Sequence, residues 1–188
     1  MNMKKNAIAA AIMFVACTNV NAASAAPDQG SGTVEFIGSI IDAPCSVAPE
    51  SVDQTVQMGE VSNSTLSNYG HGSTQKFNVK LEGCSFDTAK SVDVLFSGIP
   101  DVDAKNSLAL QGFAKGAAIE LSNMSTGDVI ELGKAASFSN LTDGTNILKF
   151  GATLVSTVTA PDVPDESRAA AIVPGDFNAT ANFVLTYK

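Results

Sequence analysis

The chain has 188 residues, with 11 Lys or Arg against 19 Asp or Glu, and its formal net charge is −8. Recognition of phosphates needs a basic stripe, and the lysines here are scattered singly, so a nucleic-acid partner is not expected. The length is ordinary for one domain.

The first residues carry the pattern of a secretory signal peptide. Lys4 and Lys5 precede an apolar run at 7–16 that leads into small residues. The run is shorter than the roughly 20 apolar residues of a transmembrane helix. We expect cleavage after Ala25, with Ala22 as the alternative, so that residues 1–25 are removed. The remaining chain has nine basic and nineteen acidic residues and a charge of −10.

The three cysteines leave one pair after export. Cys17 falls within the signal peptide, although a lipoprotein signal ending at Cys17 is a weaker alternative because Phe14 fits it poorly. An even pair in an exported chain predicts a disulfide between Cys45 and Cys84. Zinc is the competing reading, but two thiols and one distant histidine do not supply four ligands.

Residues 26–32 are rich in Pro, Gly and polar side chains and predict a flexible leader. An extended strand follows, and one of its faces carries Val34, Phe36, Gly38 and Ile40. Its other face includes Thr33, Glu35 and Ser39, whereas Ile37 and Ile41 break the alternation.

Further runs rich in Thr, Val, Ile and Phe predict strands, and turn-rich stretches separate them. The predicted ranges are 55–58, 75–81, 92–96, 117–121, 129–132, 147–158 and 177–187. Many short strands without a long helical pattern are typical of an all-β sandwich. Residues 165–172 could form a helical turn, but the prolines around them favour a surface loop.

The last predicted strand is long and amphipathic. One face carries Phe177, Ala179, Ala181, Phe183, Leu185 and Tyr187. Polar residues dominate the other face, which also contains Val184. If this strand lies at a sheet edge, its free backbone groups can pair with another chain.

The two ends together resemble the chaperone–usher pilus subunits, especially the major shaft subunits of P pili and type 1 pili. The segment Gly32–Cys45 is similar to the donor-strand extension of that family as it runs into the first cysteine. Gly175 stands fourteenth from the end of the sequence, Tyr187 is penultimate, and Cys84 has the expected place of the second cysteine. The resemblance implies an immunoglobulin-like sandwich that lacks its last strand and is completed by a neighbouring subunit.

The resemblance also implies how the chain is divided and used. Residues 26–41 would be the donor-strand extension and residues 42–188 the pilin domain. Val34, Phe36, Gly38 and Ile40 would insert into a neighbour's groove. The groove, which also binds the chaperone, would use Gly175, Phe177, Ala179, Ala181, Phe183, Leu185 and Tyr187.

The same family implies partners and a location. We expect related subunits in a head-to-tail polymer, a periplasmic chaperone, an outer-membrane usher and a surface fimbrium that supports adhesion; binding of a host receptor stays open. A minor or adaptor subunit is the close alternative. A tip adhesin is a weaker one, because such an adhesin carries an additional binding domain.

Residue chemistry gives little reason to expect an enzyme. His71 lies in a glycine-rich loop without a carboxylate or cysteine near it in sequence, and catalysis would need a nucleophile and an orienting group beside it. Asp101, Asp103 and Asp143 lack the spacing of a calcium-binding loop, so surface positions near turns are expected. No catalytic residue, cofactor site or metal site is predicted.

Overall fold

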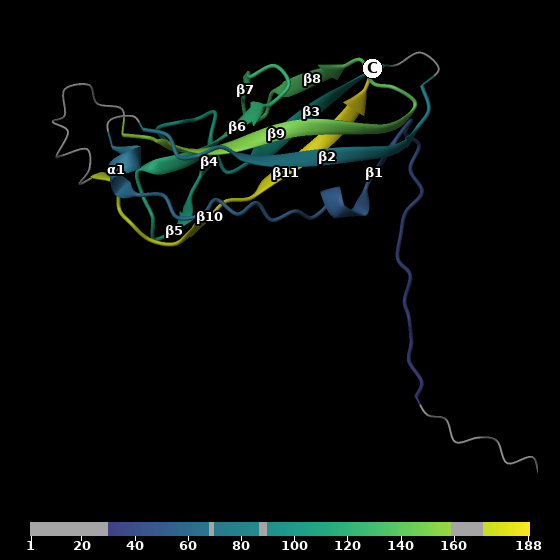
Figure 1. Ribbon diagram of the computed structural model, residues 1–188, viewed down its shortest axis with the longest axis horizontal. Helices are drawn as coiled ribbons and strands as arrows, with labels where there is room; N and C mark the ends of the chain where they lie inside the picture. Colours follow the sequence, from purple (N-terminus) through teal and green to yellow (C-terminus); the bar gives the residue numbers. More distant parts are fainter. Residues whose placement is uncertain (1–29, 68–69, 87–89, 159–170) are drawn as a thin grey trace, which may run out of the picture. The chain divides into compact units, whose positions relative to one another are not determined.

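The computed structural model describes residues 30–67, 70–86, 90–158 and 171–188 (Figure 1). The chain divides into two compact units, Met1–Ser39 and Ile40–Lys188. Residues 30–39 of the first unit contain neither helix nor strand. Within the described ranges, no helix is long and apolar enough to cross a membrane. The predicted signal peptide and most of the possible helical turn at 165–172 lie outside the described residues.

The larger sheet of the second unit is antiparallel. Its strands follow the order β1 (Ser46–Val47), β2 (Gln75–Cys84), β9 (Gly144–Ser156), β6 (Ala117–Asn123) and β4 (Leu108–Ala109), with β7 (Val129–Ile130) also pairing with β6. Inward-facing residues alternate along the central strands, as in β2, where Phe77, Val79 and Leu81 are separated by more exposed polar residues. The sheet therefore presents one apolar face.

The smaller sheet has β3 (Ser91–Gly98) at its centre, β8 (Ala135–Ser139) on one side and β11 (Ala181–Tyr187) on the other. Val92, Val94 and Phe96 of β3 are almost fully buried. Further elements in the described ranges are short: β5 (Gln111–Gly112) pairs with β10 (Phe177–Asn178), and η1 (Pro49–Ser51) and α1 (Asn63–Leu66) are short helices.

Aromatic rings join the two sheets into a sandwich. Phe150 of the larger sheet contacts Phe96 and Phe138 of the smaller sheet, with ring centroids 5.1 and 5.2 Å apart and edge-on geometry. Phe77 stacks on Phe150 at 5.3 Å. Such pairs stabilise a core beyond the area that they bury. The inner faces of both sheets thus form a single hydrophobic core.

The predicted disulfide is confirmed. Cys45 and Cys84 are bonded, with their Cα atoms 4.2 Å apart, and both are buried. The bond ties the residue before β1 to the last residue of β2, where the chain leaves the sheet.

The all-β class and the incomplete sandwich are also confirmed. Among the described strands, only β3 pairs with β11, so β11 forms an open edge (Figure 1). Most predicted strands are present, but three expectations were wrong. The segment that begins at Thr33 is extended but is not a strand, because it has no pairing partner among the described residues. Residues 55–58 are not a strand because they have no pairing partner, and the run 177–187 is divided into β10 and β11 at Ala179–Thr180.

Candidate subunit-binding groove

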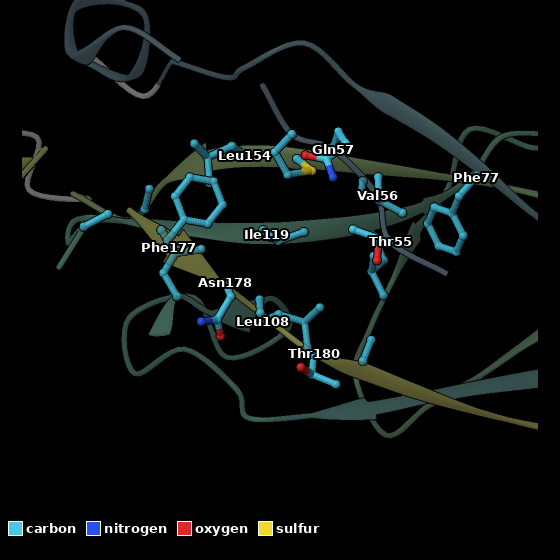
Figure 2. Close-up of a pocket in the computed structure, with 18 of the residues that line it drawn as sticks. Thr55, Val56, Gln57, Phe77, Leu108, Ile119, Leu154, Phe177, Asn178 and Thr180 are labelled. Atoms are coloured by element: carbon cyan, nitrogen blue, oxygen red, sulfur yellow. The ribbon is translucent and has the colours of Figure 1, made fainter. Parts of the chain in front are cut away.

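An apolar groove of about 1230 Å³ opens between the two sheets of the second unit. Its floor comes from β4, β6 and β9 of the larger sheet, including the buried side chains of Leu108, Ile119 and Leu154 (Figure 2). Its two sides are the segment 51–61 and the segment 172–183. Figure 2 shows Thr55, Val56 and Gln57 on one side and Phe177, Asn178 and Thr180 on the other.

One side of the groove continues into β11, whose free edge offers unpaired backbone groups. Lys188 and Ser91 exchange both backbone hydrogen bonds, with N···O distances of 3.0 and 3.3 Å. Antiparallel strands alternate between hydrogen-bonded and non-hydrogen-bonded pairs, so the even-numbered residues of β11 are bonded to β3. The N–H and C=O groups of Ala181, Phe183, Leu185 and Tyr187 therefore point away from β3, toward the open edge.

The other side is an extended segment that is equally unpaired. Residues 53–61 form no backbone–backbone hydrogen bond with any other described residue. Gln54 holds the start of this segment, since its Nε2 donates to the carbonyl of Asn78 at 2.8 Å and to that of Ser51 at 3.2 Å. Val56 and Met58 pack partly buried against the core. The groove thus has an apolar floor between the unpaired segment 53–61 and the side that leads into the free edge of β11.

Most of the residues predicted for the groove meet there. Phe177, Ala179, Ala181 and Phe183 line it and are half-buried, and Phe183 lies 6.2 Å from Phe96 between ring centroids. Leu185 and Tyr187 follow on the same face of β11, beyond the lining residues, and pack partly buried against the core.

Gly175 also lines the groove, and its lack of a side chain has a local reason. A Cβ atom there would lie 2.8 Å from Phe113 Cβ and 3.0 Å from the backbone nitrogen of Ala114. The backbone of Asp176 accepts a hydrogen bond from Phe113 N at 3.0 Å, which keeps the two segments together. Gly175 therefore permits a close approach of two backbones at the rim of the groove.

Tyr187 has a polar group without a partner. Its hydroxyl is buried and makes no hydrogen bond in the structure, and burial raises the pKa of this hydroxyl above its ordinary value. The ring centroid of Phe86 lies 6.5 Å from that of Tyr187. Tyr187 is the last residue of β11, and Phe86 follows Cys84 of the disulfide by two residues.

The residues predicted to insert lie on an extended segment. Val34, Phe36, Gly38 and Ile40 belong to neither helix nor strand, and the three large side chains among them are 74% to 103% exposed. Ile37 and Ile41 are exposed as well. Their insertion into another subunit stays a prediction.

Two of the carboxylates considered for chemistry, Asp101 and Asp143, accept hydrogen bonds from the backbone. Asp101 Oδ1 accepts from the backbone nitrogens of Asp103 and Ala104 at 2.9 and 3.0 Å, and Asp143 Oδ1 accepts from Phe86 N at 2.9 Å. His71 is exposed and forms an isolated bridge with Val155. No group of three His, Cys, Asp or Glu side chains that could hold a metal occurs in the described part of the chain.

Sequence reasoning missed most of the floor and the second side of the groove. Leu108 lies in a two-residue strand, and within residues 53–61 the sequence predicted only a strand at 55–58. The alternation of Val56 and Met58 was the available signal, but a single pattern does not show whether an extended segment has a partner.

Known proteins of the same architecture match the whole chain. The profile of the family described as "Fimbrial protein" matches residues 34–188. The Fimbria A protein of Serratia marcescens is 41% identical over 188 residues, covering 100% of both chains, and the Major MR/P fimbria protein of Proteus mirabilis is 38% identical, covering 99% of this chain and 100% of that protein.

Two solved pilus structures are similar to this chain as well. One is a chain of a chaperone–usher pilus whose structure reveals the molecular basis of rod uncoiling. It superposes on this chain with a TM-score of 0.72 at 28% identity, and the match covers 86% of this chain and 98% of that chain. The P pilus rod subunit PapA gives a TM-score of 0.64 at 27% identity, covering 78% of this chain and 100% of that chain. The chain therefore belongs to the fimbrial protein family and is a structural subunit of a pilus.

Proposed function

We propose that this pilus subunit polymerises head to tail by donating residues 26–41 of one copy to the groove of the next copy's domain, residues 42–188. The observation that supports this is the groove itself, whose apolar floor lies between the unpaired segment 53–61 and the side that leads into the free edge of β11. Val34, Phe36 and Ile40 would cover the floor, and the backbone of the inserted strand would pair with β11. Each copy donates to one neighbour and accepts from another, which generates an open filament.

The physical driving force is burial together with strand pairing. Covering apolar surface is worth about 25 cal/mol per Å². Addition of a strand to an open sheet edge also satisfies backbone donors and acceptors. The same exposed surfaces would make a lone subunit prone to aggregate. We therefore propose that a periplasmic chaperone occupies the groove first and that an outer-membrane usher directs the exchange.

The route of export follows from the same proposal. Removal of residues 1–25 in the periplasm would free the donor segment, and the assembled fimbrium is extracellular. The names of two relatives contain the word "major", and the similar solved chains include a rod subunit, which supports a place in the shaft. A high copy number in purified fibres would support the shaft, and a few copies per fibre would identify a minor or adaptor subunit.

Deletion of residues 26–41 behind the signal peptide tests the polymerisation. This chain keeps its groove and loses its donor strand, so we expect it to bind chaperone and to stop filament growth as a chain end. A matched control lacks only residues 26–31 and should still polymerise. Filament length measured by electron microscopy in cells that coexpress the wild type is the readout. Internal incorporation of the long deletion at the wild-type rate would overturn the proposal.

A further inference from the structure

We propose that Ile37 fixes the register of the inserted strand by lying opposite Val184 of the accepting copy, with the strand antiparallel to β11. This inference rests on the proposed polymerisation. It concerns the outer face of the inserted strand, away from the groove, and the two isoleucines that break the alternation of the donor segment. Ile37 is 88% exposed, and Val184 is 58% exposed.

The outer face of the smaller sheet carries one apolar row. Val184 lies directly opposite Leu95, and Leu95 lies directly opposite Ala135 on the next strand. The two neighbouring rows are polar. They are Thr186–Asp93–Ser137 on one side and Asn182–Ser97 on the other. Along these three rows, Val184 is therefore the one β11 residue that offers an apolar neighbour to an apolar side chain added beside the strand.

The outer face of the donor segment has the same pattern. Glu35, Ile37 and Ser39 project to the side opposite Val34, Phe36, Gly38 and Ile40. With Ile37 beside Val184, the apolar row grows to four strands, while Glu35 meets Thr186 and Ser39 meets Asn182. Glu35 then also approaches Lys188, a cation that pairs with Asp93. A shift by two residues places Ile37 beside a polar side chain and either Glu35 or Ser39 beside Val184.

The inner face selects the same register independently. Antiparallel pairing of Ile37 with Val184 places Gly38 opposite Phe183 and Ile40 opposite Ala181, so that a large side chain meets a small one in these two pairs, while Phe36 lies opposite Leu185. A slip by two residues sets Phe36 or Ile40 against Phe183. The parallel arrangement also sets Phe36 against Phe183. Among these arrangements, only the proposed register keeps large donor side chains away from Phe183 and also keeps the outer rows matched.

The backbone geometry makes this pairing testable by cross-linking. Val184 is hydrogen-bonded to β3, so on its other side it would form a non-hydrogen-bonded pair, in which Cα atoms are about 4.5 Å apart. That distance permits a disulfide, whereas Cβ atoms of diagonal neighbours are about 7 Å apart and do not reach well.

The test uses full-length chains that carry two added cysteines. Ile37→Cys with Val184→Cys should convert purified filaments into a covalent ladder on a non-reducing denaturing gel, with loss of most of the monomer band. Glu35→Cys with Val184→Cys and Ser39→Cys with Val184→Cys are matched controls, and each single cysteine shows the background. These controls should keep the monomer band.

The outcomes separate the two proposals. A dominant ladder from Glu35→Cys or Ser39→Cys would overturn the register and leave donor-strand polymerisation intact. Filaments that give no ladder with any of the three donors would overturn the register, and the deletion of residues 26–41 decides separately whether the donor segment is needed for polymerisation.

A second measurement does not depend on disulfides. Ile37→Thr and Val184→Thr filaments are compared with the double variant for the rate of subunit dissociation in urea. Cross-strand pairs of this kind correspond to a coupling of about 1.4- to fivefold in that rate. Strictly independent effects of the two substitutions would overturn the pairing of Ile37 with Val184.

Discussion

Asp93 is a carboxylate on the outer face of the smaller sheet with two partners. Ser137 Oγ donates to Asp93 Oδ1 at 2.6 Å, and Lys188 Nζ pairs with Asp93 Oδ2. The hydrogen bond from Lys188, followed by that from Ser137, holds the pKa of Asp93 below its ordinary value. The folded state therefore favours the ionised carboxylate.

The sign of the resulting pH dependence is fixed. Because the folded pKa lies below the unfolded one, the stabilisation by Asp93 is present above about pH 4 and is lost as the pH falls through the folded pKa. We expect Asp93→Asn to lower stability at neutral pH and to flatten the loss of stability in acid. Urea unfolding midpoints of filaments measured down to about pH 2 provide the test. Asp53→Asn, at an exposed position without an ion pair among the described residues, is the control. Equal acid profiles for both variants would contradict the role of Asp93.

Gly175 permits a close backbone approach that any side chain would disturb. A Cβ atom would meet Phe113 Cβ and the Ala114 nitrogen, neither of which is the end of a flexible side chain. We expect Gly175→Ala to lower the free energy of unfolding by about 1–3 kcal/mol, as overpacking does. Asp176→Ala removes an exposed side chain at the next residue and should change it little. Urea denaturation measures the free energy of unfolding of both variants. Equal values for Gly175→Ala and Asp176→Ala would show that the close backbone contact at Gly175 tolerates a side chain.

At the scale of elements, the sequence predicts strands well where a regular pattern coincides with strong burial. The predicted ranges 75–81 and 92–96 lie within β2 and β3, because alternation in β2 and a continuous apolar run in β3 leave little choice. β8 was missed because Phe138 is its one large apolar side chain. Residues 55–58 have a strand-like pattern without a partner, and pairing is a property of the rest of the fold.

The disulfide is the covalent link between elements. It joins the entrance of β1 to the end of β2 across 39 residues of sequence. Loss of a native disulfide from a small exported domain typically costs about 2–5 kcal/mol. We expect Cys45→Ser combined with Cys84→Ser to lower the free energy of unfolding by that amount and to reduce the yield of periplasmic subunit. Unfolding and yield unchanged from the wild type would show that sheet packing alone suffices.

At the scale of the whole molecule, each end of the chain was informative for a different reason. The alternation in 177–187 predicted the face of β11 that meets the groove, since burial imposes that alternation. Neither the floor near Leu108 nor the second side at 53–61 could be predicted, because they arise from residues distant in sequence. In the sequence, Ile37 and Val184 are only exceptions to the apolar–polar alternation of their segments. The pairing of β11 with β3 places Val184 in an apolar row, which Ile37 would extend in the proposed register.

The polymer contact can be tested at a single glycine of the donor segment. Gly38 projects no side chain on the face that carries Val34, Phe36 and Ile40, and the proposed register sets it against Phe183. Gly38→Leu would add a branched side chain there, and overpacking a fitted core costs about 1–3 kcal/mol. We therefore expect filament assembly to slow or stop.

Glu35→Leu is the matched control, because it adds the same side chain to the opposite face of the same strand. A one-residue change of position switches the face of a strand, so this leucine points away from the groove and assembly should continue nearly normally. Both full-length variants are offered to chaperone-bound subunits, and strand exchange is followed by native gel electrophoresis. Exchange at the same rate by both variants would mean that the Gly38 face does not enter the groove, since a buried and an exposed leucine cannot be equivalent at a fitted contact.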